Sequence, residues 1–257
     1  MIEIRNVYKW FITRTSDILA LEDVSLTVGE GDFVAFVGPS GCGKSTLLNM
    51  IAGLMEPTSG SILYRGKESK GVNTDMGYIT QHDSLFPWRN VEQNVGISLE
   101  IQRIPWDERS KRIQKYINLV GLQGCEKHYP SQLSGGMRKR VALARTLIYD
   151  PVALLLDEPF GALDAQLKLI LQDELLKIWD RTRKTMIFVT HDLGEAIALA
   201  DRLVVFTGRP GRIKLIRDIP IERPRDVFQI RFAPLFGQLY EEIWESLRGE
   251  VSKGEDL

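Results

Sequence analysis

The amino-acid sequence predicts an α/β fold built around a mostly parallel β-sheet. From residue 152 onward, short apolar runs alternate with stretches of helical periodicity, in the order strand, helix, strand, helix, strand. Earlier in the chain, the nearly continuous apolar run Asp32–Val37 passes through a glycine-rich turn into Lys44–Leu54, which has the pattern of a helix. Alternation of this kind is typical of chains that place parallel strands side by side.

The N-terminal region predicts an antiparallel sheet in addition to the parallel one. Residues 1–8 and 21–28 alternate apolar and polar side chains, as strands with one buried face do. Residues 60–65 and 76–80 predict two further strands. We therefore expect an N-terminal antiparallel β-subdomain.

A helical segment interrupts the strand pattern after Gln81. Residues 91–148 have helical periodicity, with one apolar face that carries Ile113, Ile117, Val120 and Leu122. We expect a helical subdomain, about residues 85–150, inserted in the core of one domain that spans residues 1–257. Strands and helices resume at 152–156, 164–182, 185–189, 193–200 and 202–206. Residues 231–247, in a C-terminal tail of about 226–257, predict a helix that packs on the core or binds a partner.

The composition excludes several classes of protein. The 257 residues carry a formal net charge of −1, so the chain lacks the basic excess typical of nucleic-acid-binding proteins. Two cysteines, Cys42 and Cys125, suggest no disulfide framework and indicate a reducing compartment. The N-terminus lacks a signal-peptide pattern. The longest apolar stretch, Val152–Leu156, is far shorter than the roughly 20 residues of a membrane helix, so we expect any membrane role to depend on a partner.

A phosphate-binding loop follows the strand at residues 32–37. The motif G-x-x-x-x-G-K-[ST] is matched by Gly38, Pro39, Ser40, Gly41, Cys42, Gly43, Lys44, Ser45 and Thr46. Its glycines let successive backbone N–H groups curl around phosphate oxygens at a helix N-terminus. Lys44 would supply a positive charge near the β- and γ-phosphates, and the Ser45 hydroxyl would ligate Mg²⁺.

Two carboxylates end the apolar strand of residues 154–156. Asp157 is placed to hold Mg²⁺ directly or through water, and Glu158 to act as a general base on an attacking water. An acidic turn after a buried strand has no such meaning by itself. The phosphate-binding loop earlier in the chain gives the two carboxylates these predicted roles in nucleotide hydrolysis.

A second glycine motif, Leu133–Met137, opens a predicted helix. One nucleotide needs one phosphate-binding loop. We therefore interpret Ser134, Gly135 and Gly136 as half of a second pocket, which another copy of the chain completes. The two motifs together predict a nucleotide-dependent dimer.

The order of these motifs resembles that of the ABC-transporter ATPases, and the resemblance covers nearly the whole chain. It rests on the phosphate-binding loop together with Leu133–Met137, Asp157–Pro159, Ala162–Asp164 and Val189–Asp192. It implies a P-loop NTPase core in which Ser134, Gly135, Gly136 and Met137 of one subunit close over ATP held by the other. It also implies that His191 is a switch histidine that contacts the γ-phosphate and that Gln81 touches Mg²⁺. Asp164 would lie at the dimer interface, and the Phe11 ring would stack on adenine. Tyr8 and Trp10 are alternatives for the stacking ring.

Three segments resemble one branch of this family, the ATPases of nitrate, sulfonate, taurine and bicarbonate importers. They are Leu133–Met137, Leu85–Trp88 and Gly208–Ile213. Met137 and Lys139 depart from the glutamines common in the family, but neither belongs to the serine and glycines expected to contact phosphate.

The resemblance implies the ATP- and Mg²⁺-dependent subunit of an importer for a small, anionic solute. Its partners would be a second ATPase subunit, a membrane permease at the cytoplasmic face of the membrane and, indirectly, a solute-binding protein, with no nucleic acid. Phe86, Pro87 and Trp88 would form a groove for a permease helix, unless Trp88 packs within the helical insert. An exporter ATPase with a separate permease and a soluble ABC ATPase outside transport are the alternatives. The solute cannot be identified from this subunit, which does not touch it.

Overall fold

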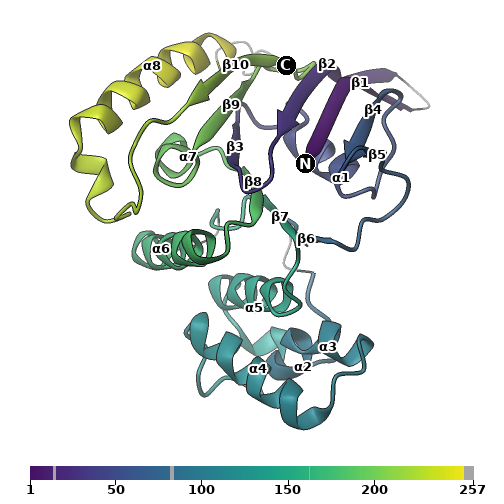
Figure 1. Cartoon of the computed structure of the whole chain (residues 1–257), viewed down its shortest axis with the longest axis vertical. Helices are drawn as coiled ribbons and strands as arrows, with labels where there is room; N and C mark the ends of the chain where they lie inside the picture. Colours follow the sequence, from purple (N-terminus) through teal and green to yellow (C-terminus); the bar gives the residue numbers. More distant parts are fainter. Residues whose placement is uncertain (14–15, 82–83, 162, 252–257) are drawn as a thin grey trace. The chain divides into compact units, whose positions relative to one another are not determined.

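The computed structural model describes residues 1–13, 16–81, 84–161 and 163–251 (Figure 1). The chain forms two compact units, one of residues 1–74 with residue 176 onward, the other of residues 75–175. Both units combine strands with helices, and this confirms the predicted α/β class.

An antiparallel sheet of the first unit contains the N-terminus. Its strand order is β2-β1-β4-β5, with the bounds Asp17–Val28, Ile2–Ile12, Ser59–Tyr64 and Lys67–Glu68. Along β1, Ile2 and Ile4 are buried whereas Glu3 and Arg5 are less so, because successive side chains of a strand point to opposite faces. Val7 is buried as well, because the register of β1 shifts between Ile4 and Val7. The predicted N-terminal antiparallel β-subdomain is confirmed.

The first unit also holds the strand that leads into the phosphate-binding loop. In the order β10-β9-β3-β8, four strands lie side by side, Ile213–Asp218, Arg202–Phe206, Phe33–Val37 and Thr185–Val189. β3 runs parallel to β8 and β9, and β10 runs antiparallel to β9. Every residue of β3 and β8 is buried, which explains their continuous apolar runs. The helices of this unit are α1 (Lys44–Ile51), the last turns of α6 (Ala165–Thr182), α7 (Leu193–Leu199), the 3₁₀ helix η2 (Ile230–Phe232) and α8 (Pro234–Val251).

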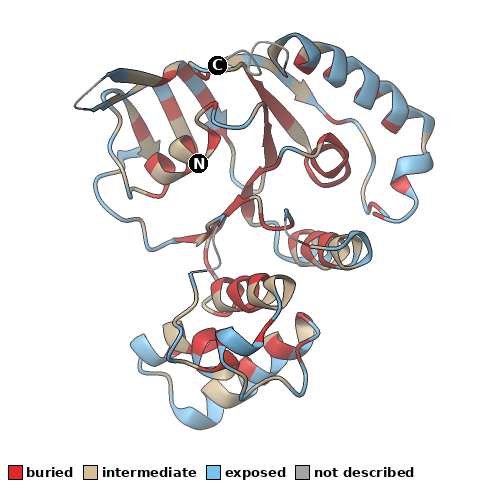
Figure 2. Ribbon diagram, turned by 180° about the vertical axis from the view of Figure 1, so that it is seen from behind, coloured by how far each residue is buried: buried red, intermediate tan, exposed pale blue. Residues whose placement is uncertain are grey.

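Helix α8 is amphipathic and packs against α7. Phe236, Leu239 and Ile243 are buried at helical spacing, whereas Tyr240 and Trp244 are exposed. Figure 2 shows the same division, with buried positions along one side of the helix and exposed positions along the other. The apolar face of the C-terminal helix is therefore covered by the protein's own core.

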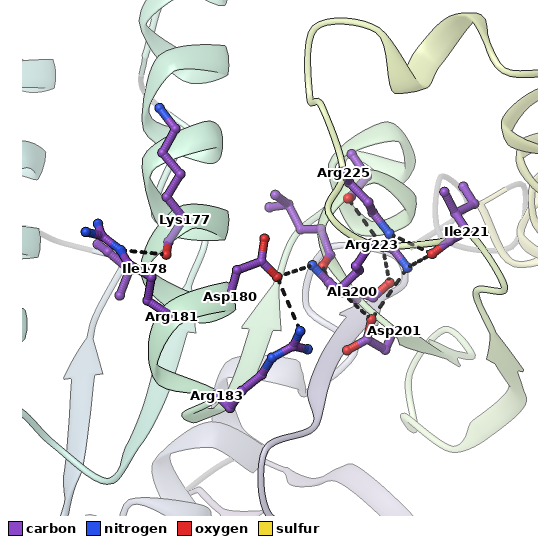
Figure 3. Close-up of polar contacts among 12 residues, drawn as sticks. Lys177, Ile178, Asp180, Arg181, Arg183, Ala200, Asp201, Ile221, Arg223 and Arg225 are labelled. Atoms are coloured by element: carbon purple, nitrogen blue, oxygen red, sulfur yellow. Dashed lines mark hydrogen bonds and ion pairs between the residues drawn. The ribbon is translucent and has the colours of Figure 1, made fainter.

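A buried arginine fastens the segment before α8 to the end of α7 (Figure 3). The Arg225 guanidinium donates to the carbonyls of Ala200 at 2.7 Å, Ile221 at 3.0 Å and Ile219 at 3.2 Å. The last carbonyls of a helix have no partner within it, so Arg225 satisfies groups that would otherwise be buried without a hydrogen bond. Loss of water around the guanidinium, reinforced by the nearby positive charge of Arg223, lowers the pKa of Arg225 to about 10.

The neighbouring Arg223 reinforces this contact. Its Nε donates to Asp201 at 2.7 Å, and its guanidinium lies 4.0 Å from the centroid of the Trp179 ring. Trp179 belongs to the last turns of α6 (Ala165–Thr182) and also packs on Phe33, with ring centroids 5.8 Å apart. These contacts attach the chain before α8 to β3 and α6.

The second unit pairs two parallel strands, β6 (Met76–Ile79) and β7 (Ala153–Asp157), with a group of helices. The helices between the two strands are α2 (Val91–Val95), α3 (Ile97–Ile101), α4 (Trp106–Leu119), η1 (Pro130–Gln132) and α5 (Gly135–Leu147). Ile113, Ile117, Val120 and Leu122 are all buried, as their spacing predicts. The subdomain limits of about 85 and 150 stay a prediction.

Among the residues that the structure describes, no helix is both long enough and apolar enough to cross a bilayer.

Candidate nucleotide site

The phosphate-binding loop, Gly38–Thr46, joins β3 to α1 as predicted. Gly41 has a φ of +74° and Gly43 a φ of +103°, values that favour glycine. A Cβ on Gly43 would lie 2.7 Å from Leu21 Cδ2 and 2.9 Å from the carbonyl oxygen of Ala20. Because Gly43 immediately precedes α1, its close packing fixes where the N-terminus of that helix begins.

Lys44 lies at the first position of α1 and is 5% exposed. Its amino group donates to the carbonyls of Gly38 at 2.8 Å and Pro39 at 2.7 Å. These bonds hold the lysine charge at the beginning of the loop, next to the N–H groups that open α1. A positive charge beside a helix N-terminus is an arrangement that attracts phosphate. Cys42 in the same loop is buried.

His191 lies at the same edge of the strands as this loop. Phe36 of β3 pairs with Val189 of β8, and the N–H of Thr190 donates to the Phe36 carbonyl at 3.2 Å. Two residues beyond that pair, the chain reaches Gly38 on one strand and His191 on the other. The structure therefore brings the predicted switch histidine, which is exposed, to the strand end beside the phosphate-binding loop.

The turn that carries His191 is fixed by Thr190 and Asp192 of the Val189–Asp192 motif together with Glu195, which the sequence analysis did not single out. Thr190 donates through Oγ1 to Glu195 at 2.6 Å and accepts from the N–H of Asp192 at 3.0 Å. Asp192 in turn caps α7 by accepting from the N–H of Glu195 at 3.1 Å. The Asp-x-x-Glu spacing of a helix N-terminus was the available signal for this arrangement.

The predicted carboxylates lie at the end of β7 in the second unit. Asp157 is 3% exposed, and its negative charge adds to the effect of burial in raising the pKa of Tyr78 on β6. Glu158 has a φ of +47°, which is uncommon for a residue with a Cβ. Ile79 pairs with Leu156, so Gln81 and Glu158 both lie two residues past the same pair. Gln81, Asp157 and Glu158 therefore meet at one edge of the strand pair.

The second glycine motif begins a helix, as predicted. Ser134 is the N-cap of α5, and its Oγ accepts from the N–H of Met137 at 3.3 Å. Gly135 and Gly136 form the first turn, and Ser134 itself is exposed. A Cβ on Gly136 would lie 3.0 Å from Leu163 Cδ2. A helix N-terminus flanked by an exposed hydroxyl is suited to bind an anion.

Two further residues lie close to these motifs, Lys139 within α5 and Asp164 at the start of α6. Lys139 is buried, and its amino group donates to the carbonyls of Gln81 and, at 3.3 Å, of Thr80. This contact ties α5 to the end of β6, and the sequence contained no signal for it. Asp164 is exposed and caps α6 by accepting from the N–H of Leu167 at 2.9 Å. Ala162 of the same motif lies outside the described residues.

The predicted magnesium ligands have suitable chemistry. Ser45, Gln81 and Asp157 offer hydroxyl, amide and carboxylate oxygens, and Mg²⁺ prefers oxygen ligands. Ser45 belongs to the first unit, Gln81 and Asp157 to the second. Within the part of the chain that the structure describes, no cluster of three or more His, Cys, Asp or Glu forms a metal cage. Magnesium in phosphate sites is held by one or two carboxylates together with oxygens of the substrate, and this residue set fits that pattern.

The adenine-stacking residue is not selected by the described contacts. Phe11 is half-buried on β1, and the Lys9 amino group lies 5.5 Å from the centroid of its ring. Tyr8 is half-buried and Trp10 is 42% exposed. The assignment to Phe11 stays a prediction.

Comparison with known proteins finds relatives among ATP-binding proteins of ABC transporters. A protein-family profile described as ABC transporter matches residues 21–161. The chain is 50% identical over 252 residues to an uncharacterized ABC transporter ATP-binding protein of Methanocaldococcus jannaschii, which covers 98% of this chain and 93% of the relative.

Two relatives carry names that state a substrate. The chain is 41% identical to the nitrate import ATP-binding protein NrtD of Synechocystis, which covers 98% of this chain and 97% of that protein. It is 44% identical to the aliphatic sulfonates import ATP-binding protein SsuB of Bacillus cereus, over 87% of this chain and 88% of the relative. A solved dimer of the ATP-binding cassette MJ0796 in a post-hydrolysis state, bound to ADP and Pi, matches with a TM-score of 0.79 and 31% identity. It covers 86% of this chain and 100% of the solved one.

Proposed function

Because the chain belongs to the ABC transporter family of ATP-binding proteins, we propose that it energises an importer for a small anionic solute through a separate membrane permease. Membership of the family makes the chain an ATPase. The importer role, the solute class and the individual residue roles are our proposal.

The observation that carries the catalytic part of the proposal is the position of Glu158. This carboxylate directly follows buried Asp157 at the end of β7, on backbone with positive φ. In our proposal Asp157, Ser45 and Gln81 would hold Mg²⁺, and the ion would neutralise charge on the phosphates. Glu158 accepts a proton from the attacking water, and His191 donates to the γ-phosphate. Lys44 and the N–H groups of the loop hold the phosphates throughout.

We propose that two copies act together. The solved cassettes that the chain resembles are dimers. Ser134 caps a helix N-terminus and is exposed, so it is available to a phosphate held outside its own subunit. ATP would then be bound between the phosphate-binding loop of one copy and the Ser-Gly-Gly motif of the other. Closure on ATP and reopening after hydrolysis would supply the differential binding energy that a permease needs to alternate between two states.

A cavity of about 450 Å³ in the second unit is our candidate for the permease contact. Trp88 and Trp106 line it and are 71% and 58% exposed, and Ile113 lies among the other lining residues. The alternative that Trp88 packs within the helical insert is wrong at this exposure. The Phe86 and Trp88 rings lie in a tilted contact, with centroids 5.5 Å apart. A hollow that combines two exposed tryptophan rings with the charged side chains of Arg89, Glu92, Glu100 and Arg109 suits a short amphipathic helix.

The anionic solute follows from the two relatives whose names state nitrate and aliphatic sulfonates. Both names also state import, which favours import over export for this chain. The soluble alternative outside transport has no such support, since the relatives described above are transporter ATP-binding proteins.

The test is to purify this chain from membranes with the permease that accompanies it, and to reconstitute that complex with a solute-binding protein. We expect ATPase activity to rise when the binding protein is loaded with nitrate or an alkanesulfonate, and Trp88→Ala to lose both co-purification of the permease and this stimulation. Trp244→Ala is the matched control, because Trp244 is 47% exposed on α8 of the other unit. Stimulation that needs no binding protein would favour an exporter, and stimulation by nucleic acid would point away from transport.

A further inference from the structure

The turn between β9 and β10 has no role in the function proposed above. It contains Gly208–Ile213, the segment that resembles the importer branch. The N–H of Gly211 donates to the Ala20 carbonyl at 2.9 Å, and the N–H of Glu22 donates to the Gly211 carbonyl at 3.0 Å. On its other side, the N–H of Gly208 donates to Glu250 Oε2 at 3.1 Å. The turn is therefore held by both β2 and α8.

This turn lies directly against the phosphate-binding loop. A Cβ on Gly211 would lie 1.9 Å from the Cys42 carbonyl oxygen, so the two backbones touch with no space for a side chain. Arg209, two residues before Gly211, brings its guanidinium close to the loop. Its Nη2 lies 3.4 Å from where a Cβ on Gly41 would be. Both Gly41 and Arg209 are exposed.

The side chain of Arg209 differs from the other basic side chains of this hairpin. In the ranges that the structure describes, it forms no ion pair and no hydrogen bond. Each of the others lies 2.7–3.0 Å from a carboxylate, in the pairs Arg202–Asp32, Arg212–Glu22, Lys214–Glu250 and Arg217–Glu242. An unpaired cation on an anchored turn, beside a loop built for phosphate, is available for an anion that the loop binds.

We propose that Arg209 binds the phosphate chain of the nucleotide held by the phosphate-binding loop of its own subunit. This inference rests on the nucleotide site proposed above and adds a residue to it. A guanidinium presents several N–H donors in a fixed fork that matches phosphate oxygens. Because the turn is already fixed by β2 and α8, little backbone order would be lost when Arg209 binds. Lys44 would then supply charge from α1, and Arg209 from β9–β10.

The experiment is a titration of the isolated subunit with fluorescent ATP and ADP analogues in the presence of Mg²⁺. The variants are Arg209→Ala and Arg209→Lys, with Arg212→Ala as the matched control from the same turn and Lys44→Ala as the reference for loss of the site. We expect Arg209→Ala to weaken ATP binding about tenfold, the effect of one charge-assisted hydrogen bond. ADP binding should weaken less, because ADP carries less negative charge. Arg209→Lys should fall in between, and Arg212→Ala should bind like the wild type.

The dependence of ATP affinity on ionic strength, together with ATP-dependent dimerisation, distinguishes phosphate binding by Arg209 in its own subunit from other roles of this residue. The difference between wild type and Arg209→Ala should shrink as ionic strength rises, since the interaction is between charges near the surface. ATP affinity in Arg209→Ala equal to that of Arg212→Ala, while Lys44→Ala loses binding, would overturn the inference and leave the nucleotide site intact. Unchanged affinity with loss of ATP-dependent dimerisation in a Glu158→Gln background would also overturn it, and would assign Arg209 to the partner copy. Normal ATP binding by Lys44→Ala would instead overturn the nucleotide site itself.

Discussion

Replacement of Gly43 by alanine tests whether the phosphate-binding loop needs glycine because other atoms pack against the Cβ position, in addition to the left-handed backbone angles. Gly43 combines a φ of +103° with two contacts under 3.0 Å from its Cβ position, to Leu21 and Ala20. Gly66 has a φ of +76°, but nothing lies within 4 Å of its Cβ position. The pair therefore separates the backbone cost, which both share, from the steric cost, which only Gly43 has.

The expected magnitudes follow from these two terms. Left-handed backbone costs a residue with a Cβ about 1–2 kcal/mol, so Gly66→Ala should lower the free energy of unfolding by about that amount. Overcrowding adds about 1–3 kcal/mol, so Gly43→Ala should lower it by roughly 2–5 kcal/mol. The backbone oxygen of Ala20 cannot move aside as a side chain can, and relief of the clash would displace the start of α1. Gly43→Ala should therefore also lose ATP affinity, by an order of magnitude or more.

The assay is urea unfolding of both variants followed by tryptophan fluorescence, together with titration of the same preparations with a fluorescent ATP analogue. Gly66→Ala should keep the ATP affinity of the wild type. Equal destabilisation by the two substitutions, with ATP binding retained in both, would refute the argument that the packing of Gly43 against Leu21 and Ala20 shapes the site.

Three further predictions test other parts of the site and the fold. Glu158→Gln should keep ATP affinity but lower phosphate release by about 10²–10⁴-fold, the scale of a lost general base; near-normal turnover would remove Glu158 from that role. In the Glu158→Gln background, ATP should give a dimer by size-exclusion chromatography with light scattering, and addition of Ser134→Arg should abolish it; a double variant that still dimerises would contradict a pocket shared between subunits. Arg225→Met should cost about 3–5 kcal/mol in urea unfolding, because it leaves the carbonyls of Ala200, Ile219 and Ile221 without their donor, at about 1–3 kcal/mol for each buried group. Arg217→Met, which breaks only an exposed pair with Glu242, should cost about 1 kcal/mol or less.

Much of the fold was predictable because its signals are local. The strands Thr185–Val189 and Arg202–Phe206 have the predicted limits, since each is an apolar run with polar residues on both sides. The buried face of the helical segment was predictable from the spacing of Ile113 and Ile117, which lie one turn apart. Element ends that depend on tertiary packing differed, as α8, which runs to Val251 and not to residue 247, shows.

The site residues also divide into those that local sequence predicts and those that only tertiary contacts bring to the site. The phosphate-binding loop, the carboxylates and the Ser-Gly-Gly helix start were predictable, because each motif is contiguous and its chemistry depends on neighbours within a few residues. The contact of Lys139 with the Gln81 carbonyl was not predictable, since it joins residues of two elements far apart in the chain. The sequence likewise left open whether Trp88 is buried, and its 71% exposure in the structure excludes the packed alternative.

The sequence by itself determined which groups the chain offers for phosphate and Mg²⁺, because the loop N–H groups, the lysine and the carboxylates belong to short contiguous motifs. Only the tertiary structure decided which distant residues stand beside that chemistry. Arg209 follows Gly41 by more than half the length of the chain, yet it lies against that glycine because β9 and β3 are adjacent parallel strands with their ends at one edge. Arg212, in the same turn, faces Glu22. Two arginines with similar sequence surroundings thus differ in partner, and the pairing of strands is what separates them.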